Sequence, residues 1–182
     1  LTSAIIESLN YMVTMKTIYG INIVVSNHSY GGGGFIQAEQ DAIQATIDAG
    51  ILYVAAAGNF SIDNDANPFY PASYPLDGII SVAASDQDDN FASFSHFGLT
   101  SVDIAAPGVD VLSTTLGGGY GLSTGTSMAS PHVAGTAALI LRANPDWDND
   151  ALRLQLQTTA DDLGLSGRDP AYGFGIVDVL EA

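Results

Sequence analysis

The chain has 182 residues, no cysteine, 47% hydrophobic residues and a formal net charge of −16. Four basic residues against twenty acidic ones argue against nucleic acid and anionic membranes as partners, because both bind clustered lysine and arginine. No apolar run reaches the ~18 residues that a membrane-spanning helix needs. The composition indicates one acidic globular domain with a real core. It excludes disulfides, thiol nucleophiles and cysteine-ligated metals.

The first sixty residues alternate between helical and strand-like patterns. Residues 3–13 carry apolar side chains at helical spacing, whereas residues 21–25 and 51–57 are short apolar runs typical of buried strands. A second helix is expected between these strands, after the glycine run of residues 31–34. Short apolar strands that alternate with helices predict βαβ units and a parallel sheet.

The second half of the chain continues this pattern. Two more strands and a hairpin are expected over residues 79–84, 102–106, 111–116 and 120–123. The segment after Ser127 is apolar nearly all round, which predicts a buried helix. Asp148 is a suitable N-cap for a last helix, with Leu152 and Leu156 on its inner side. We therefore expect an α/β fold with a mainly parallel central sheet and helices on both faces.

Residues 125–135, Gly-Thr-Ser-Met-Ala-Ser-Pro-His-Val-Ala-Gly, carry the most specific chemical pattern. They set Ser127 on a glycine-led turn at the start of a buried helix, where unpaired N–H groups and the positive end of the dipole are exposed. A serine in this position is suited to attack a carbonyl carbon while backbone donors stabilise the oxyanion. The local pattern equally fits a serine that only caps the helix.

The same eleven residues resemble the serine-nucleophile signature of the subtilisin-like serine peptidases. Residues 27–32, 55–59 and 172–177 resemble other segments of that family, in the expected order. The resemblance implies a subtilisin-like three-layer α/β/α fold and serine endopeptidase activity. It implies that Ser127 is the nucleophile and that Asn59 donates to the oxyanion, whereas Asn59 could otherwise be a turn residue after Gly58.

The catalytic aspartate and histidine of that family precede all of these segments, in motifs led by Asp-Thr-Gly and His-Gly-Thr-His. Neither motif occurs in this sequence. We therefore expect residues 1–182 to be a partial catalytic domain that lacks its N-terminal part and is inactive alone. A missing segment or a companion chain would supply both groups. His28 is expected to be structural and His132 to point away from Ser127. His96 is expected either at the surface or behind the residues that line the site.

The resemblance also implies where a polypeptide substrate binds. Two backbone segments would form the walls of the primary specificity pocket, namely Ser29, Tyr30 and Gly31 on one side and Ala56, Ala57 and Gly58 on the other. The first wall would pair with an extended peptide as an added strand. Phe69 falls at the base of this pocket. If its ring points inward the pocket is shallow, and if it points outward large apolar side chains fit.

The chemistry itself is expected to need no cofactor. A structural Ca²⁺ is considered at Asp103, because in some relatives the matching aspartate helps to hold a cation together with a carbonyl near Pro75. Residues 63–67 begin like a calcium loop but lack its glycine. The glycine run of residues 31–34 could cradle a phosphate, but the lysine and the serine or threonine of a P-loop do not follow it.

The sequence thus predicts a secreted subtilisin-like endopeptidase that acts on polypeptides. One alternative is a catalytically silent homologue that works as a peptide-binding module, and a second is a nucleotide-binding domain. If the opening strands of the domain are missing, a sheet edge is left uncovered. Apolar side chains of the two N-terminal helices would then be partly exposed, with Ile5, Leu9, Ile43 and Ile47 as the candidates.

Overall fold

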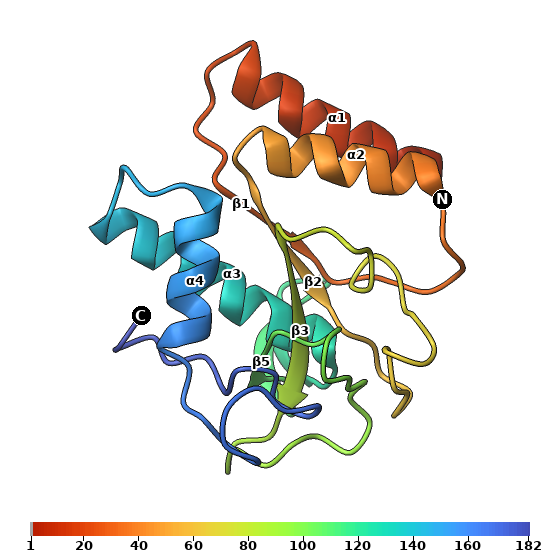
Figure 1. The fold of residues 1–182 in the computed structure, drawn as a ribbon, viewed down its shortest axis with the longest axis vertical. Helices are drawn as coiled ribbons and strands as arrows, with labels where there is room; N and C mark the ends of the chain where they lie inside the picture. Colours follow the sequence, from red (N-terminus) through yellow and green to blue (C-terminus); the bar gives the residue numbers. More distant parts are fainter. Residues whose placement is uncertain (1) are drawn as a thin grey trace.

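In the computed structural model, which describes residues 2–182, a central sheet lies between helices on both of its faces (Figure 1). The helices are α1 (Thr2–Thr17), α2 (Gln37–Asp48), α3 (Thr126–Ala143) and α4 (Asn149–Thr158). The strands are β1 (Val25–His28), β2 (Leu52–Ala56), β3 (Ile79–Ser85), β4 (Ile104–Pro107), β5 (Val111–Thr115) and β6 (Gly119–Ser123).

The central sheet has four strands in the order β1-β2-β3-β4, and every neighbouring pair is parallel. Helix α2 connects β1 to β2, as expected for a βαβ unit. The carboxyl ends of the strands therefore meet at one edge of the sheet. This arrangement confirms the predicted mainly parallel sheet and brings the residues that follow β1 and β2 side by side.

The two faces of the sheet build two separate cores. Leu52 and Val54 pack toward α3 and α4, whereas Tyr53 and Ala55 pack toward α1 and α2. Successive side chains of a strand point to opposite faces, so a continuously apolar strand can serve both cores. The predicted three-layer α/β/α architecture is confirmed.

One strand differs in position from its prediction. A strand was expected over residues 21–25, but β1 spans Val25–His28. Ser26 and His28 are both buried, and Ser26 Oγ donates a hydrogen bond to the carbonyl oxygen of Leu52 at 3.4 Å. A polar side chain is tolerated inside a sheet when its hydrogen bonds are made. Asn27 and His28, which were expected to lie beyond the end of the strand, are therefore part of it.

The expected exposure of the N-terminal helices is found only in part. Leu9 and Ile43 are 1% and 0% exposed, because α1 and α2 pack on each other and on the sheet. Ile5 and Ile47 are half-buried. Strand β1 lies at the edge of the sheet formed by the described residues. Within residues 2–182, the helices are too short or too polar to cross a membrane.

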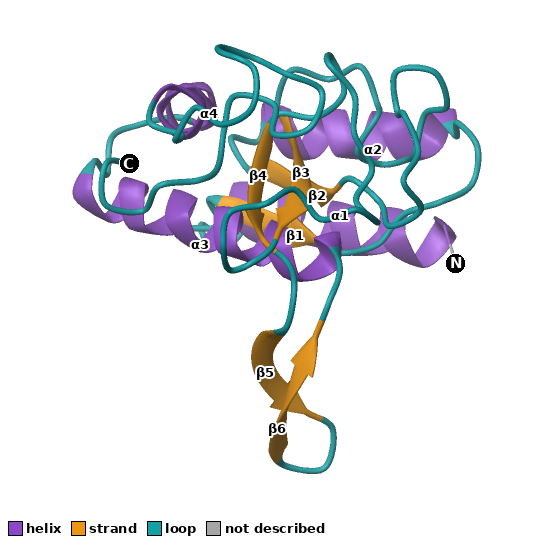
Figure 2. Cartoon of the chain, turned by 90° about the horizontal axis from the view of Figure 1, so that it is seen from below, coloured by secondary structure: helices purple, strands orange, loops and turns teal. Residues whose placement is uncertain are grey.

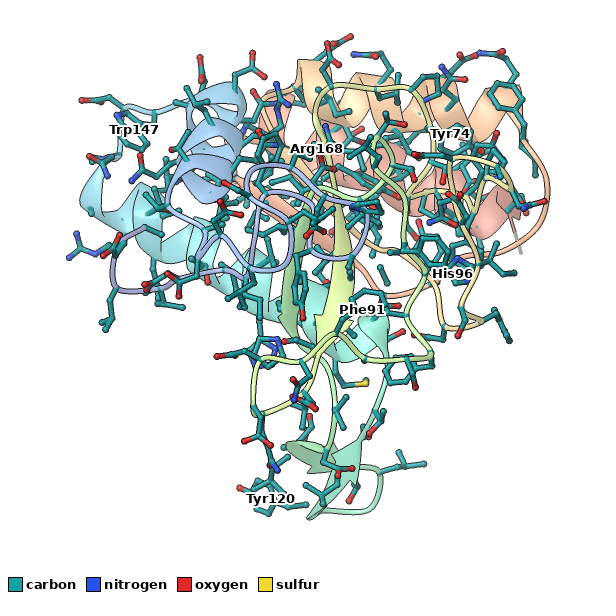
Figure 3. All side chains as sticks on the ribbon, turned by 60° about the horizontal axis from the view of Figure 1, so that its bottom comes forward. Tyr74, Phe91, His96, Tyr120, Trp147 and Arg168 are labelled. Atoms are coloured by element: carbon teal, nitrogen blue, oxygen red, sulfur yellow. The ribbon has the colours of Figure 1, made fainter. Side chains whose placement is uncertain are left out.

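Strands β5 and β6 form the predicted hairpin, which extends away from the rest of the molecule (Figure 2). Its large apolar side chains face outward, and Tyr120 marks its far end in Figure 3. Strand β6 ends at Ser123, and α3 begins at Thr126. The hairpin therefore leads directly into the segment that carries Ser127.

Candidate active site

Ser127 lies in the first turn of α3, directly after a glycine with an unusual backbone conformation. Gly125, the N-cap of α3, has a φ of 153°, which L side chains rarely adopt. Among the described residues, the Ser127 backbone N–H donates no hydrogen bond. The first N–H groups of a helix lack partners inside the helix, so this donor is directed outward. The predicted turn at the mouth of α3 therefore exists, and its free donor belongs to Ser127 itself.

The hydroxyl group of Ser127 contacts the residue that follows β1. Ser127 Oγ donates to the carbonyl oxygen of Ser29 at 3.2 Å, and Ser29 Oγ donates to the carbonyl oxygen of Ser127 at 2.8 Å. Ser127 is partly exposed. The predicted nucleophile and the first predicted wall of the specificity pocket are thus in direct contact.

Asn59 follows β2 at the same edge of the sheet. Its Oδ1 accepts hydrogen bonds from Thr126 N at 2.8 Å and from Thr126 Oγ1 at 3.0 Å. Thr126 Oγ1 in turn accepts from the backbone N–H of Gly58 at 3.2 Å. Because both bonds use the amide oxygen, the NH₂ group of the exposed Asn59 side chain is directed away from Thr126. Asn59 is therefore oriented as a donor, next to the residue that precedes Ser127.

The two predicted walls of the specificity pocket leave the sheet side by side. Strands β1 and β2 are paired with His28 opposite Ala55, so residues 29–31 and 56–58 continue from neighbouring positions. Ser29 and Tyr30 are partly buried, and Ala56 and Ala57 are buried. The structure thus brings together all six backbone positions that the sequence assigned to the walls.

Phe69 points inward, between these walls. A Cβ added at Gly31 would overlap the Phe69 ring, and one added at Gly58 would overlap the imidazole of His96. The rings of Phe69 and His96 are in edge contact, with centroids 4.9 Å apart. Two aromatic rings therefore fill the space from one wall to the other. The orientation that the sequence left open is the one that gives a shallow pocket.

The three histidines of the chain make no hydrogen bond to Ser127 within residues 2–182. His28 stacks on Tyr53 with centroids 3.6 Å apart, and burial lowers its pKa to about 3. His132 is exposed, and its Nδ1 contacts the carbonyl oxygen of Met128. Each ring thus has structural partners, and the described residues offer Ser127 no imidazole base.

Of the two positions expected for His96, the structure shows the one behind the site, because His96 is only 1% exposed and packs against Gly58. Its Nδ1 donates to Asn64 Oδ1 at 2.8 Å, while Asn64 Nδ2 donates to the carbonyl oxygen of Ala57 at 2.9 Å. Burial lowers the pKa of His96. A neutral His96 beneath Gly58 is a feature that sequence reasoning missed, and the surrounding turn residues gave no signal of it.

Asp103 does not offer calcium a suitable set of ligands. Its Oδ2 accepts from Ser81 N at 2.9 Å, and its Oδ1 lies 3.3 Å from Arg168 Nη2. Calcium takes about 6–8 oxygen ligands. Within residues 2–182, no group of three or more His, Cys, Asp or Glu side chains is placed to hold a metal ion. The residues around Asp103 therefore do not fit the cation considered from the sequence.

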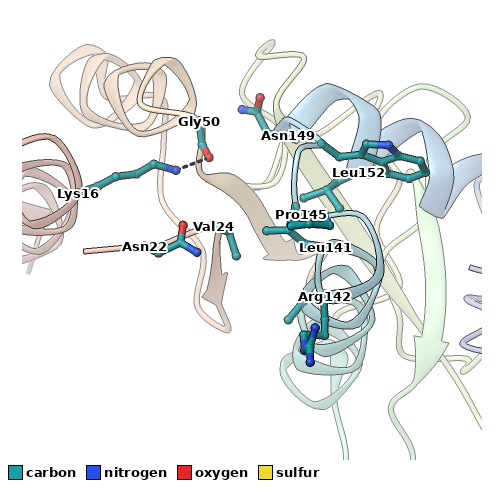
Figure 4. Close-up of a pocket in the computed structure, with 11 residues that line it drawn as sticks. Lys16, Asn22, Val24, Gly50, Leu141, Arg142, Pro145, Asn149 and Leu152 are labelled. Carbon is teal, nitrogen blue, oxygen red and sulfur yellow. Dashed lines mark hydrogen bonds between the residues drawn. The ribbon is translucent and has the colours of Figure 1, made fainter. Parts of the chain in front are cut away.

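A cavity of about 400 Å³ lies apart from these residues (Figure 4). Val24 and Gly50, which precede β1 and β2, line it together with residues from α1, α3 and the start of α4. Lys16 Nζ donates to the carbonyl oxygen of Gly50 at its rim, at 2.8 Å. Because Ser127 and Asn59 lie near the opposite ends of these strands, the cavity contains none of the predicted site residues.

Comparisons with known proteins identify the family of the chain. The sequence profile of the Subtilase family matches residues 3–175. The chain belongs to the subtilase family. It is 42% identical over 162 residues to subtilisin E of Bacillus subtilis, which covers 88% of this chain and 41% of that protein. It is 42% identical over 158 residues to subtilisin Savinase of Lederbergia lenta, at 87% and 55% coverage.

The fold of this subtilase chain also matches a solved structure. A protease of Pseudoalteromonas arctica superposes with a TM-score of 0.76 at 36% sequence identity. The match covers 87% of this chain and 50% of that one. The chain thus spans about half or less of the length of these relatives. The subtilisin-like α/β fold predicted from the sequence is confirmed.

Proposed function

We propose that the chain carries the nucleophile and the oxyanion site of a serine endopeptidase, within a subtilase catalytic domain of which residues 1–182 are a part. The observation that carries this proposal is the position of Ser127 on the first turn of α3. Its N–H is unpaired among the described residues, and the oriented amide of Asn59 lies beside it. Two such donors are what a developing oxyanion requires. Membership of the subtilase family supports the same reaction class.

The proposed reaction proceeds through an acyl-enzyme. Ser127 Oγ attacks the carbonyl carbon of the scissile peptide bond and passes its proton to a histidine supplied by another segment or chain. The Ser127 N–H and Asn59 Nδ2 stabilise the oxyanion. The C–N bond then breaks, the histidine gives its proton to the leaving amine, and water releases the acyl group. An aspartate beside the histidine would orient it.

We infer that the polypeptide substrate lies along Ser29, Tyr30 and Gly31 and presents a small side chain to the pocket. The inward ring of Phe69 supports this preference, because it occupies the space that a large side chain needs. One missing or added methylene in such a pocket changes the rate about 10- to 200-fold. Secretion of the protein, which the family resemblance predicts, stays a prediction.

Labelling by a fluorophosphonate tests the function. The chain alone is expected to label slowly, because Ser127 has no base among the described residues. The N-terminal segment of a relative that carries the Asp-Thr-Gly and His-Gly-Thr-His motifs is then added to the chain. The resulting reconstituted enzyme should be labelled at Ser127 and should cleave peptides. Ser127→Ala is the matched control and should abolish both signals. Fast labelling of the chain alone would contradict the need for an outside base, and a silent reconstituted enzyme would contradict the function.

The second candidate function is a catalytically silent module that binds peptides. The observation that favours it is the absence of a histidine hydrogen bond to Ser127 Oγ within residues 2–182. A peptide of small residues would bind this module with an affinity that Ser127→Ala leaves unchanged, and it would stay intact. Mass spectrometry of the peptide after incubation with the reconstituted enzyme separates the two functions.

A further inference from the structure

The guanidinium group of Arg168 lies among oxygen atoms, beside the carboxylate that the sequence suggested as a cation ligand. A single nitrogen, Nη2, donates to the carbonyl oxygens of Thr100 at 2.9 Å and Val102 at 3.0 Å. The same nitrogen lies 3.3 Å from Asp103 Oδ1. One positively charged atom therefore faces two carbonyl oxygens and a carboxylate oxygen. Carbonyl and carboxylate oxygens are the kinds of ligand that hard cations take, although these three are fewer than the about 6–8 that calcium binds.

The arginine is held in this place by the segment that follows α4. Its guanidinium lies over the ring of Phe174, at 5.0 Å from the centroid, which is within the range of a cation–π contact. The backbone N–H of Phe174 donates to the carbonyl oxygen of Asp103 at 2.8 Å. Gly173 packs so closely on Asp103 that an added Cβ would overlap its backbone. Arg168 and Asp103 thus join this segment to the start of β4.

The charge of Asp103 needs a compensating partner. Its side chain is 17% exposed, in a chain with a net charge of −16. Besides Arg168, its carboxylate accepts only neutral donors among the described residues, namely Ser81 N at 2.9 Å and Gln157 Nε2 at 3.4 Å. A buried carboxylate left without a positive partner is strongly destabilising. Arg153 also contributes a positive charge near this carboxylate. Of the two arginines, only Arg168 forms an ion pair with it, so the Arg168 side chain occupies the place that an ion from solution would take.

We propose that Arg168 is a built-in cation that takes the place of a metal ion at Asp103. The guanidinium group holds the segment after α4 against the start of β4, and no ion from solution is needed for this contact. A variant without this side chain would expose the oxygens of Thr100, Val102 and Asp103 to solvent cations. The proposal concerns the stability of the fold, and it holds whether or not Ser127 is a nucleophile.

Arg168→Met, which removes the charge and keeps an unbranched apolar side chain, provides the test. We expect the melting temperature measured in EDTA to fall by roughly 5 °C relative to the unaltered protein. Calcium chloride, added at constant ionic strength, should restore part of this loss. Calorimetric titration with calcium should reveal one binding site in Arg168→Met that the unaltered protein lacks.

Three further variants make the result specific. Asp103→Asn/Arg168→Met should neither bind the additional calcium nor recover with it. Arg153 lines the same cavity as Asp103 and Arg168, but it forms no ion pair between described residues. Arg153→Met should therefore gain no calcium site. If Arg168→Met does not fold in EDTA, Arg168→Lys should fold with an intermediate melting temperature. An unchanged melting temperature in Arg168→Met would overturn the proposal, as would an equal calcium response in the single and double variants.

Discussion

The side-chain oxygen of Asn59 accepts a hydrogen bond from the backbone N–H of Thr126 at 2.8 Å. This bond joins the end of β2 to the first residue of α3 and directs the NH₂ group of Asn59 away from Thr126. A second bond, from Thr126 Oγ1, fixes the same orientation. The donor end of the amide is therefore set by a residue that takes no part in the proposed chemistry.

Asn59→Asp separates the proposed catalytic role of this side chain from its structural one. The aspartate keeps an acceptor for both groups of Thr126 but loses the NH₂ donor and adds a negative charge. We expect kcat of the reconstituted enzyme to fall by about 10²–10³-fold, the magnitude established for such a donor in a subtilisin. The melting temperature should stay nearly unchanged. Thr126→Val removes both hydrogen bonds of Oγ1, to Asn59 and from Gly58, but keeps the backbone N–H bond to Asn59. It should cost no more than about tenfold; an equal loss in both variants would argue against an oxyanion role.

Phe69→Ala should widen the specificity of the reconstituted enzyme. Removing the ring opens the space between Gly31 and Gly58, so substrates with phenylalanine before the scissile bond should gain relative to those with alanine. We expect the ratio of the two kcat/KM values to change by about 10- to 200-fold. Phe60, which is 72% exposed and whose ring centroid lies 6.0 Å from that of His96, offers a matched control. An identical shift in Phe60→Ala would show that the pocket does not set the preference.

His28 makes the stability of the fold depend on pH. Burial lowers its pKa to about 3 in the folded chain, against ~6.5 when unfolded. Between these values the unfolded state binds the proton, so the free energy of unfolding decreases as the pH falls from about 6.5 toward 3. The slope is at most ~1.4 kcal/mol per pH unit for one such group. Burial lowers the pKa of His96 as well, which adds to the effect in the same direction.

Thermal unfolding tests this dependence when it is measured between pH 4 and 8, a range of about four units that spans most of the titration. His28→Phe keeps an aromatic ring to stack on Tyr53 and should flatten the profile below pH 6.5 relative to the unaltered chain. His132→Gln, at an exposed position outside the stack on Tyr53, provides the comparison for loss of a histidine elsewhere in the chain. Parallel profiles for His28→Phe and the unaltered chain would rule out His28 as the source.

Strand β1 should accept a further partner. It lies at the edge of the described sheet, and a cavity beside it is lined by Ile5, Leu9 and Met12 from α1 and by His28 and Tyr30. Burial of such apolar surface is worth about 25 cal/mol per Å². Adding the N-terminal segment used for reconstitution should therefore raise the melting temperature of the chain. A cooperative transition of the monomeric chain that this segment leaves unchanged would favour the silent-homologue function.

The elements of the fold were predictable where one physical signal dominated. Continuous apolar runs correctly predicted β2 and β3. Asp148 correctly predicted the start of α4, where its side chain accepts a hydrogen bond from Ala151 N at 2.9 Å. The position of β1 was wrong because it buries the polar side chains of Ser26 and His28. Ser26 Oγ donates to the carbonyl oxygen of Leu52 across the sheet, and His28 Nε2 is hydrogen-bonded to Ser26 Oγ within the strand. Polar residues indicate the end of a strand only when their side chains have no hydrogen-bond partner in the protein interior.

The candidate site was predictable as a set of positions but not as a set of orientations. Ser127, Asn59 and the two walls follow from motifs that end strands or begin a helix. The inward ring of Phe69 contacts His96, which lies 27 positions further along the chain, and no local sequence pattern links the two residues. Arg168 was missed for the same reason, although only four basic residues occur in the chain. In so acidic a chain, each of these four is worth testing as the partner of a buried carboxylate.

Thr126 contacts Asn59 and Gly58 at once and is fully buried. The end of β2 and the beginning of α3 are therefore fastened together within this chain, before any other segment arrives. On the proposed function, the oxyanion side of the reconstituted enzyme therefore needs no further assembly. The onset of activity on mixing should then follow bimolecular kinetics, with a rate that increases in proportion to the concentration of the base-bearing segment.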